Sequence, residues 1–93
     1  MASFPHLFTP ITIRNVTIPN RILISGHFTH FAENNLPSER LKAYYERRAQ
    51  GGVGLIITEA QSITRHCWPV PNTCMADTDA IIEPYRRISE AVH

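Results

Sequence analysis

The sequence predicts an α/β fold in which a β-hairpin is followed by a strand, a helix, a second strand and a second helix. Three observations predict it: an alternating segment at residues 11–18, two short apolar runs at residues 21–25 and 53–59, and an amphipathic segment between those runs. Two parallel strands joined by a crossover helix form a βαβ unit, and such strands need cover on both faces. We therefore expect the 93 residues to be the opening part of a larger α/β domain.

Length and composition narrow the class of protein. The chain has 43% hydrophobic residues, 18% charged residues and a formal net charge of +1, which is typical of a small globular unit. Its Lys and Arg residues are scattered rather than gathered in a basic stripe, so we expect no nucleic-acid partner. No run approaches the ~18 apolar residues of a membrane span. The first residues also lack a signal-peptide pattern, so we expect no membrane partner and a cytoplasmic location.

Residues 11–18, ITIRNVTI, alternate apolar and polar side chains on either side of Arg14-Asn15. This pattern is typical of a short β-hairpin with one buried face. The apolar run RILIS at residues 21–25 then predicts the first core strand. Because Arg21 begins that strand rather than ends it, we expect this side chain to pair with a carboxylate at the end of the sheet away from any ligand.

A loop and a helix are expected next. Residues 26–37 contain Gly, two Asn and a Pro without any period, which predicts a loop. Ser38 then offers an N-cap, and Gly51 or Gly52 supplies the left-handed residue that ends the helix. The apolar stripe of this helix consists of Leu41, Tyr44, Tyr45 and Ala49, at i, i+3, i+4 and i+8. We expect both tyrosines to serve packing rather than chemistry.

The run VGLIITE at residues 53–59 is rich in β-branched residues and predicts the second core strand. The next twenty residues are weakly patterned, and we expect them to form a functional loop. The loop contains Cys67 and Cys74, which we expect to be reduced thiols in a cytoplasmic protein. From about Ile81, apolar side chains at one-face spacing predict a second helix, with Pro84 tolerated in its first turn.

The carboxyl ends of the two predicted strands carry small and polar residues. In βα folds, ligands bind at this edge of the sheet. The two ends here are Ser25-Gly26-His27 and Glu59-Ala60-Gln61, and the small residues would let the backbone approach a flat ligand closely. Glu59 either points into the ligand-binding opening at this edge or stabilises a neighbouring loop. We favour a structural role, because acid–base catalysis needs a tuned pKa and reach to the reacting atom.

Taken in order, these segments resemble the FMN-dependent Old Yellow Enzyme family of NADH:flavin oxidoreductases, in the branch that includes 2,4-dienoyl-CoA reductase and trimethylamine dehydrogenase. The resemblance rests on LFTPITIRNVTIPNRILISGHF, ERLKAYYERRAQGGVGLIITEAQSI and IIEPYRRISEAVH, which together span most of the chain. It implies the N-terminal portion of a TIM (β/α)₈ barrel with FMN, noncovalent or covalent, at its top. It also implies NAD(P)H as the reductant, an enone, enoyl thioester or amine-type substrate, and a homo-oligomer at full length.

By position, the resemblance assigns FMN contacts to residues at both strand ends. These residues are Ser25, Gly26, His27 and Phe28 after the first strand and Ala60 after the second. Relatives with covalent FMN carry a cysteine near the position of Phe28, so the flavin is expected to be noncovalent here. Many relatives carry a threonine that helps to set the flavin potential, and Phe28 cannot donate that hydrogen bond. Catalytic residues stay unassigned, and any 4Fe-4S cluster or FAD would lie beyond His93.

Other functions are weighed against this one. The 93 residues could act alone as a small non-catalytic α/β binding or interaction module, or as a piece whose only property is to complement a missing remainder. A metal site is a further alternative, but the histidines and cysteines lack the paired spacings of structural zinc sites, so we expect no metal. The candidate ligands would be His27, His30, His66, Cys67 and Cys74.

Overall fold

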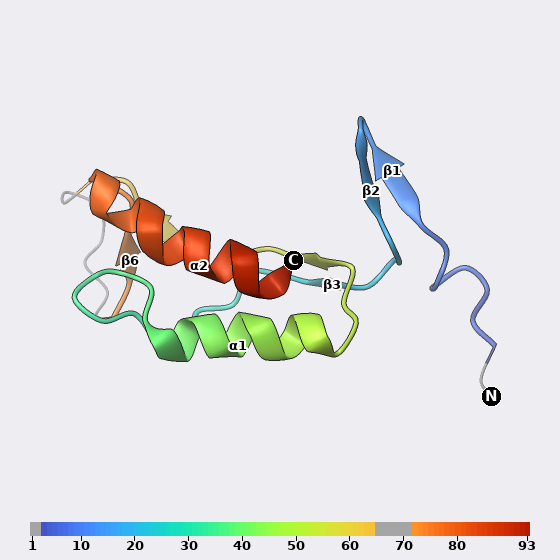
Figure 1. Cartoon of the computed structure of the whole chain (residues 1–93), viewed down its shortest axis with the longest axis horizontal. Helices are drawn as coiled ribbons and strands as arrows, with labels where there is room; N and C mark the ends of the chain where they lie inside the picture. The colour runs from blue at the N-terminus through green and yellow to red at the C-terminus, as the bar shows by residue number, and fades with distance from the viewer. Residues whose placement is uncertain (1–2, 65–71) are drawn as a thin grey trace.

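The computed structural model describes residues 3–64 and 72–93. Its element order confirms the predicted hairpin, strand, helix, strand and helix, and adds two short strands and a 3-10 turn (Figure 1). The elements are β1 (Ile11–Ile13), β2 (Val16–Ile18), β3 (Leu23–Ile24), α1 (Glu39–Gln50), β4 (Leu55–Ile56), β5 (Gln61–Ser62), β6 (Cys74–Met75), η1 (Asp79–Ile81) and α2 (Ile82–Val92).

The hairpin of β1 and β2 stands apart from the body of the molecule in Figure 1. Its strands pair antiparallel from Ile11↔Ile18 to Ile13↔Val16, as the alternation predicts. The expected buried face is reduced to Ile18, because Ile13 and Val16 are both exposed. Arg14 turns the chain with φ +55°, a left-handed conformation that is uncommon for a residue other than glycine.

The two core strands pair in parallel, as the crossover helix predicts. Leu23 lies opposite Leu55 and Ile24 opposite Ile56, and the Ile57 amide extends the ladder by donating to the Ile24 carbonyl at 2.9 Å. Both strands are shorter than their apolar runs. The expected cover is present on one face only: Ile56 packs toward the helices, whereas Leu55 and Ile57 on the opposite face are exposed.

Helix α1 begins and ends at the predicted residues. The Ser38 hydroxyl accepts a hydrogen bond from the Leu41 amide at 3.1 Å and donates one to the Phe31 carbonyl at 2.5 Å. Ser38 therefore caps the helix and also fixes the end of the preceding loop. At the other terminus Gly52 has φ +97°, the left-handed conformation that ends helices without steric cost.

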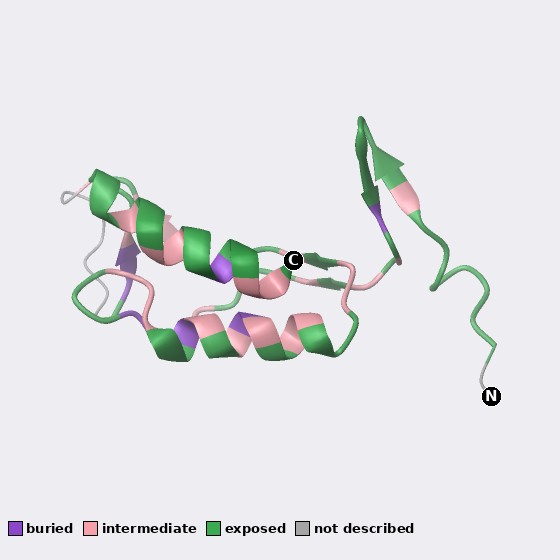
Figure 2. Ribbon diagram, viewed as in Figure 1, coloured by how far each residue is buried: buried purple, intermediate pink, exposed green. Residues whose placement is uncertain are grey.

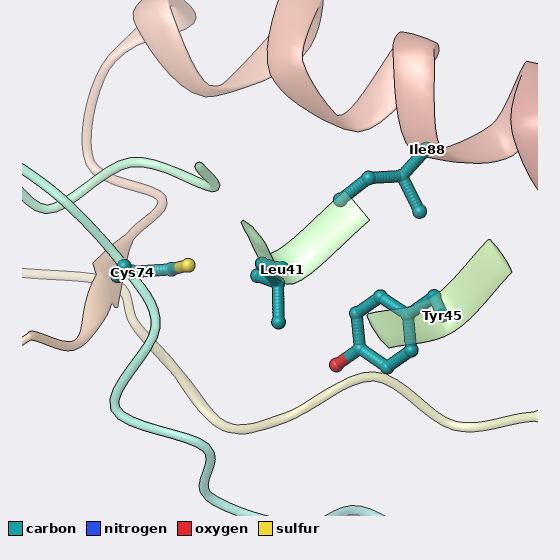
Figure 3. Packing of buried hydrophobic residues seen from close by; sticks show 5 residues of the cluster. Leu41, Tyr45, Cys74 and Ile88 are labelled. Carbon is teal, nitrogen blue, oxygen red and sulfur yellow. The ribbon is translucent and has the colours of Figure 1, made fainter. Parts of the chain in front are cut away.

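The core lies between the facing sides of α1 and α2 and the strand β6, as the buried positions in Figure 2 show. Leu41 and Tyr45 from α1, Cys74 from β6 and Ile88 from α2 point toward one another (Figure 3). Burial, together with the smaller effect of the Glu59 charge, raises the pKa of the Cys74 thiol to about 11, so this thiol is neutral at physiological pH. Tyr45 fills the core, as the stripe on α1 predicts.

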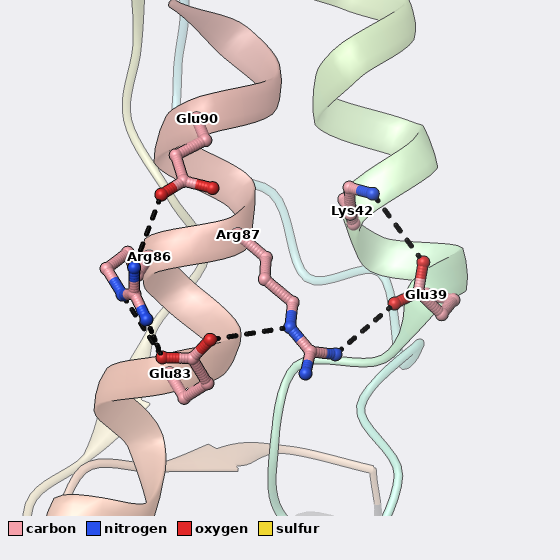
Figure 4. Close-up of polar contacts among 6 residues, drawn as sticks. All are labelled: Glu39, Lys42, Glu83, Arg86, Arg87 and Glu90. Atoms are coloured by element: carbon pink, nitrogen blue, oxygen red, sulfur yellow. Dashed lines mark hydrogen bonds and ion pairs between the residues drawn. The ribbon is translucent and has the colours of Figure 1, made fainter.

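An ion-pair network joins the two helices on their solvent side (Figure 4). Arg87 of α2 lies 3.8 Å from Glu39 of α1 and 3.7 Å from Glu83 within its own helix. The partners are exposed, and exposed pairs of this kind contribute little to stability. The apolar core, rather than this network, therefore holds the helix pair together.

Part of the stretch expected to be a loop after the second strand is ordered into sheet. The strands β5 and β6 pair in parallel, with Gln61 opposite Cys74 and Ser62 opposite Met75. Each strand has only two residues, too few to produce a readable alternation. The prediction that Cys67 is a reduced thiol falls on a residue outside the described ranges, whereas Cys74 is a free, buried cysteine.

The predicted carboxylate partner of Arg21 is wrong. Its Nε donates to the Thr9 carbonyl and its Nη2 to the Pro10 carbonyl, both at 3.1 Å. The Arg21 amide also donates to the Leu7 carbonyl at 2.8 Å. The guanidinium therefore ties the segment before the hairpin to the chain entering β3 through backbone carbonyls.

The side chain of Asn20 joins the entrances of both core strands. Its Nδ2 donates to the Gly52 carbonyl at 2.8 Å, and its Oδ1 accepts from the Ile22 amide at 3.0 Å. Gly54 passes so close that a Cβ there would lie 2.7 Å from Asn20 Oδ1 and 2.9 Å from the Asn20 carbonyl oxygen. A residue without a side chain is therefore required at the start of β4.

We expect Gly54→Ala to lower the free energy of unfolding by about 1 to 3 kcal/mol, because the added methyl group overlaps the backbone of Asn20. The matched control is Gly26→Ala, whose Cβ would sit 3.4 Å from the Thr58 carbonyl oxygen in ordinary contact. The control should change stability by less than about 0.5 kcal/mol. Urea titrations followed by circular dichroism measure both variants, and equal stability for the two would contradict this account.

The raised pKa of Cys74 predicts a loss of stability in alkali. The ordinary pKa of the thiol, 9.0, applies in the unfolded chain, and burial raises the pKa to about 11 in the folded one. Its contribution is therefore complete below pH 9 and is lost as the pH rises toward 11, at a slope of at most about 1 kcal/mol per pH unit. Unfolding titrations at pH 8 to 11 should show a shallower decline for Cys74→Ala than for the parent. Parallel declines would refute the assignment.

Candidate functional site

The carboxyl ends of β3 and β4 lie side by side at one edge of the parallel pair. A Cβ built on Gly26 would lie 3.4 Å from the Thr58 carbonyl oxygen and 3.9 Å from Ile57 Cγ2. The chain leaving β3 therefore runs directly against the chain leaving β4. This proximity confirms the expected arrangement of the two strand ends.

The residues predicted to contact a flat cofactor stand at this edge. Ser25, Gly26 and His27 are exposed, Phe28 is half-buried and Ala60 is exposed. We call residues 25–28 the rim segment. Within the described part of the chain, the backbone amides of Gly26, His27, Phe28 and Ala60 donate to no other protein group. Free amides at a strand end suit the carbonyl and nitrogen acceptors of an isoalloxazine ring, so the residues present fit FMN.

The aromatic ring of Phe28 is itself packed. It stacks on the His30 ring with centroids 4.8 Å apart and planes inclined by 7°. His30 has φ +60°, so the chain bends sharply immediately after the rim segment. The stack orients Phe28 within the loop.

Glu59 lies directly behind this edge and is only 2% exposed. Its amide donates to the Tyr45 hydroxyl at 2.8 Å, and its carbonyl accepts from Gln61 Nε2 at 2.8 Å. Its carboxyl Oε1 accepts from the Thr29 hydroxyl at 2.6 Å. Glu59 therefore joins the end of β4 to α1 and to the loop after β3, which confirms the structural role favoured from the sequence. Its Oε2 atom has no hydrogen-bond partner within residues 3–64 and 72–93.

The sequence did not single out Thr29. Its hydroxyl donates to Glu59 and accepts from the Phe31 amide at 3.2 Å, which closes a turn in the loop. A threonine in an aperiodic loop carries no signal of such a role, because the partner carboxyl lies thirty residues farther along the chain.

The tyrosines near Glu59 serve as hydrogen-bonding groups. Burial raises the pKa of Tyr45 to about 12 and is also the largest cause of the raised pKa of Tyr85. The Tyr85 hydroxyl accepts from Gln61 Nε2 at 2.5 Å. Both phenols therefore keep their protons near neutral pH, and the cluster is a fixed polar network behind the rim segment.

Among residues 3–64 and 72–93, no group of three or more His, Cys, Asp and Glu side chains is placed to hold a metal ion. His66 and Cys67 of the alternative metal site lie outside these ranges. Within the same residues, no helix has the length and apolar character needed to cross a membrane.

The model of the NADH:flavin oxidoreductase / NADH oxidase family matches residues 6–93. An NADH oxidase from Thermoanaerobacter brockii is 38% identical over 98 residues, which cover 100% of this chain and 15% of that protein. An N,N-dimethylglycine/sarcosine dehydrogenase from Chromohalobacter salexigens is 35% identical over 94 residues, or 98% of this chain and 14% of that protein.

Among solved structures, the old yellow enzyme from Trypanosoma cruzi matches with a TM-score of 0.88 at 33% identity, over 99% of this chain and 25% of that one. The chain thus spans a quarter of this structure and 15% or less of the two relatives above. The likeness confirms the fold class predicted from the sequence, the N-terminal portion of a TIM barrel. The family match over residues 6–93, together with these identities, establishes that the chain belongs to the NADH:flavin oxidoreductase / NADH oxidase family.

Proposed function

We propose that residues 1–93 form the N-terminal part of an FMN-binding TIM-barrel domain in an NAD(P)H-dependent oxidoreductase. The observation that carries this proposal is the pair of parallel strand ends lying in contact, with Gly26 against the Thr58 carbonyl. Active sites of TIM barrels are built on this edge. The 93 residues alone are not expected to turn over substrate, because they supply only two of the eight strand ends.

The bare face of the strand pair supports a barrel over a self-standing binding module. Leu23, Leu55 and Ile57 are exposed on the side opposite the helices, and Leu23 and Ile57 are close to half exposed, at 51% and 48%. In a TIM barrel this side points inward and is filled by branched aliphatic residues from all the strands. A module that functions alone would bury such a row.

In the proposed site, the rim segment and Ala60 hold FMN noncovalently through backbone groups. Bound FMN would supply the ring that takes a hydride from NAD(P)H and passes it to substrate. Gly26 and Ala60 keep the strand ends low enough for a flat ring to approach, and Phe28 offers an apolar surface beside it. The described rim carries no cysteine for a covalent flavin link.

The substrate class is proposed from the resemblance: an enone, an enoyl thioester or an amine-type substrate. The relative from Chromohalobacter salexigens, named for N,N-dimethylglycine and sarcosine, supports the amine-type member of this set. A 4Fe-4S cluster and FAD belong to the proposal only for the remainder of the enzyme. The homo-oligomeric state and the cytoplasmic location stay predictions of the sequence.

The whole proposal is tested by colour. The complete enzyme that contains these residues should purify yellow and show a flavin absorption spectrum that dithionite bleaches. The isolated 93 residues, mixed with FMN and passed through a desalting column, should remain colourless. A colourless complete enzyme that also fails to take up added FMN would refute the proposed function.

The placement of FMN is tested by Ala60→Leu in the complete enzyme. Because Ala60 stands exposed at the end of β4, a longer side chain would block the approach of the ring. We expect FMN to bind at least about tenfold more weakly, which corresponds to about 1.4 kcal/mol. The matched control is Ala43→Leu, an exposed position on α1 away from the rim, which should bind FMN as the parent does. Equal FMN affinities for the two variants, measured by flavin fluorescence, would count against this placement.

A further inference from the structure

We propose that Thr29 and Glu59 form a positioning pair that holds the rim segment in the conformation that receives FMN. This inference rests on the proposed function and adds to it two residues that lie behind the flavin contacts rather than among them. The pair is the hydrogen bond of 2.6 Å between the Thr29 hydroxyl and Glu59 Oε1.

Both ends of the rim segment are bonded to the same strand end. Before the segment, the Ile24 carbonyl accepts from the Ile57 amide at 2.9 Å. After it, Thr29 donates to Glu59, two residues farther along. The residues on either side of the rim segment, Ile24 and Thr29, are therefore both bonded to the chain at the end of β4. A backbone arc held at both ends keeps its amides in place, although those amides donate to no described protein group.

Glu59 is itself held in place from several directions. Its amide is bonded to Tyr45 of α1 and its carbonyl to Gln61 at β5. These bonds fix the backbone of Glu59, and burial of the residue, 2% exposed, restricts its side chain, so the carboxyl group presents a fixed acceptor to Thr29. A positioning group needs this kind of support, because an anchor that moves cannot fix its partner.

Thr29 transmits this constraint in both directions along the loop. Its hydroxyl group donates a hydrogen bond to Glu59, and the same oxygen accepts one from the Phe31 amide at 3.2 Å. Between these two residues the chain takes the left-handed conformation at His30, φ +60°, which returns the His30 ring onto Phe28. Loss of the Thr29 hydroxyl would thus release the end of the rim segment and the turn that orients Phe28.

The bond with Thr29 also gives the buried carboxyl group of Glu59 a hydrogen-bond partner. A buried carboxyl oxygen without a donor is costly, and Thr29 supplies the one donor that the described residues offer to this group. Apolar packing could fill the same volume, but it could not set the direction of a loop through one short bond.

The test uses the complete FMN-loaded enzyme. Thr29→Val removes the hydroxyl and keeps the branched shape, and it should weaken FMN binding about tenfold and shift the flavin absorption spectrum. Thr29→Ser keeps the hydroxyl and should bind FMN within about twofold of the parent. The control is Thr17→Val, which loses the exposed Thr12 to Thr17 contact of 3.1 Å in the hairpin and should also stay within about twofold.

A double-mutant cycle assigns the effect to the pair. Glu59→Met should weaken FMN binding in the parent but add less than about twofold in the Thr29→Val background, because one bond cannot be lost twice. If the double variant loses FMN affinity by the product of the two single losses, the proposed pairing of Thr29 and Glu59 is wrong. Hydrogen exchange provides a readout independent of flavin: the Phe31 amide should exchange faster in Thr29→Val than in Thr29→Ser.

The outcomes separate the two proposals. If the parent binds no FMN, the proposed function fails and the positioning role fails with it. If the parent binds FMN and Thr29→Val binds it equally well with an unchanged spectrum, only the positioning role is overturned. Faster exchange at Phe31 with unchanged FMN affinity also overturns it, because the bond would then serve the loop alone.

Discussion

The parallel pairing of β3 and β4 is the constraint on which the rest of the structure depends. Because the strands run in the same direction, the chain must return between them, and α1 makes that return along one face. The same direction also brings both carboxyl ends to one edge, where Gly26 meets the Thr58 carbonyl. An antiparallel pair would have sent these ends to opposite edges and separated the rim segment from Glu59.

Packing and chemistry divide between the two sides of this pair. On the helix side, Leu41, Tyr45 and Ile88 close an apolar core. At the carboxyl edge, the same Tyr45 turns its hydroxyl to the amide of Glu59 at 2.8 Å. One side chain thus connects the core to the polar cluster, so the position of the rim segment is coupled to how α1 packs.

The features that the sequence predicted correctly are those set by interactions between near neighbours in the chain. The bounds of α1 were predicted from Ser38, from the apolar stripe that includes Tyr45 and from the left-handed Gly52. These signals are readable because capping and helical periodicity involve residues that are near neighbours in the sequence. What escaped prediction depends on contacts between distant segments. Arg21 donates to a carbonyl of an aperiodic segment in place of a carboxylate. Thr29 donates to Glu59, which lies thirty residues farther along the chain. The short β5 and β6 leave no readable period.

The uncovered side of the strand pair has a consequence for aggregation. Leu23, Leu55 and Ile57 present a row of aliphatic groups next to strand edges that can accept another strand. Such surfaces on incompletely assembled chains are the ones that aggregate and that chaperones capture. In the proposed barrel, neighbouring strands would cover this row, and we expect the row to favour aggregation for as long as it is uncovered.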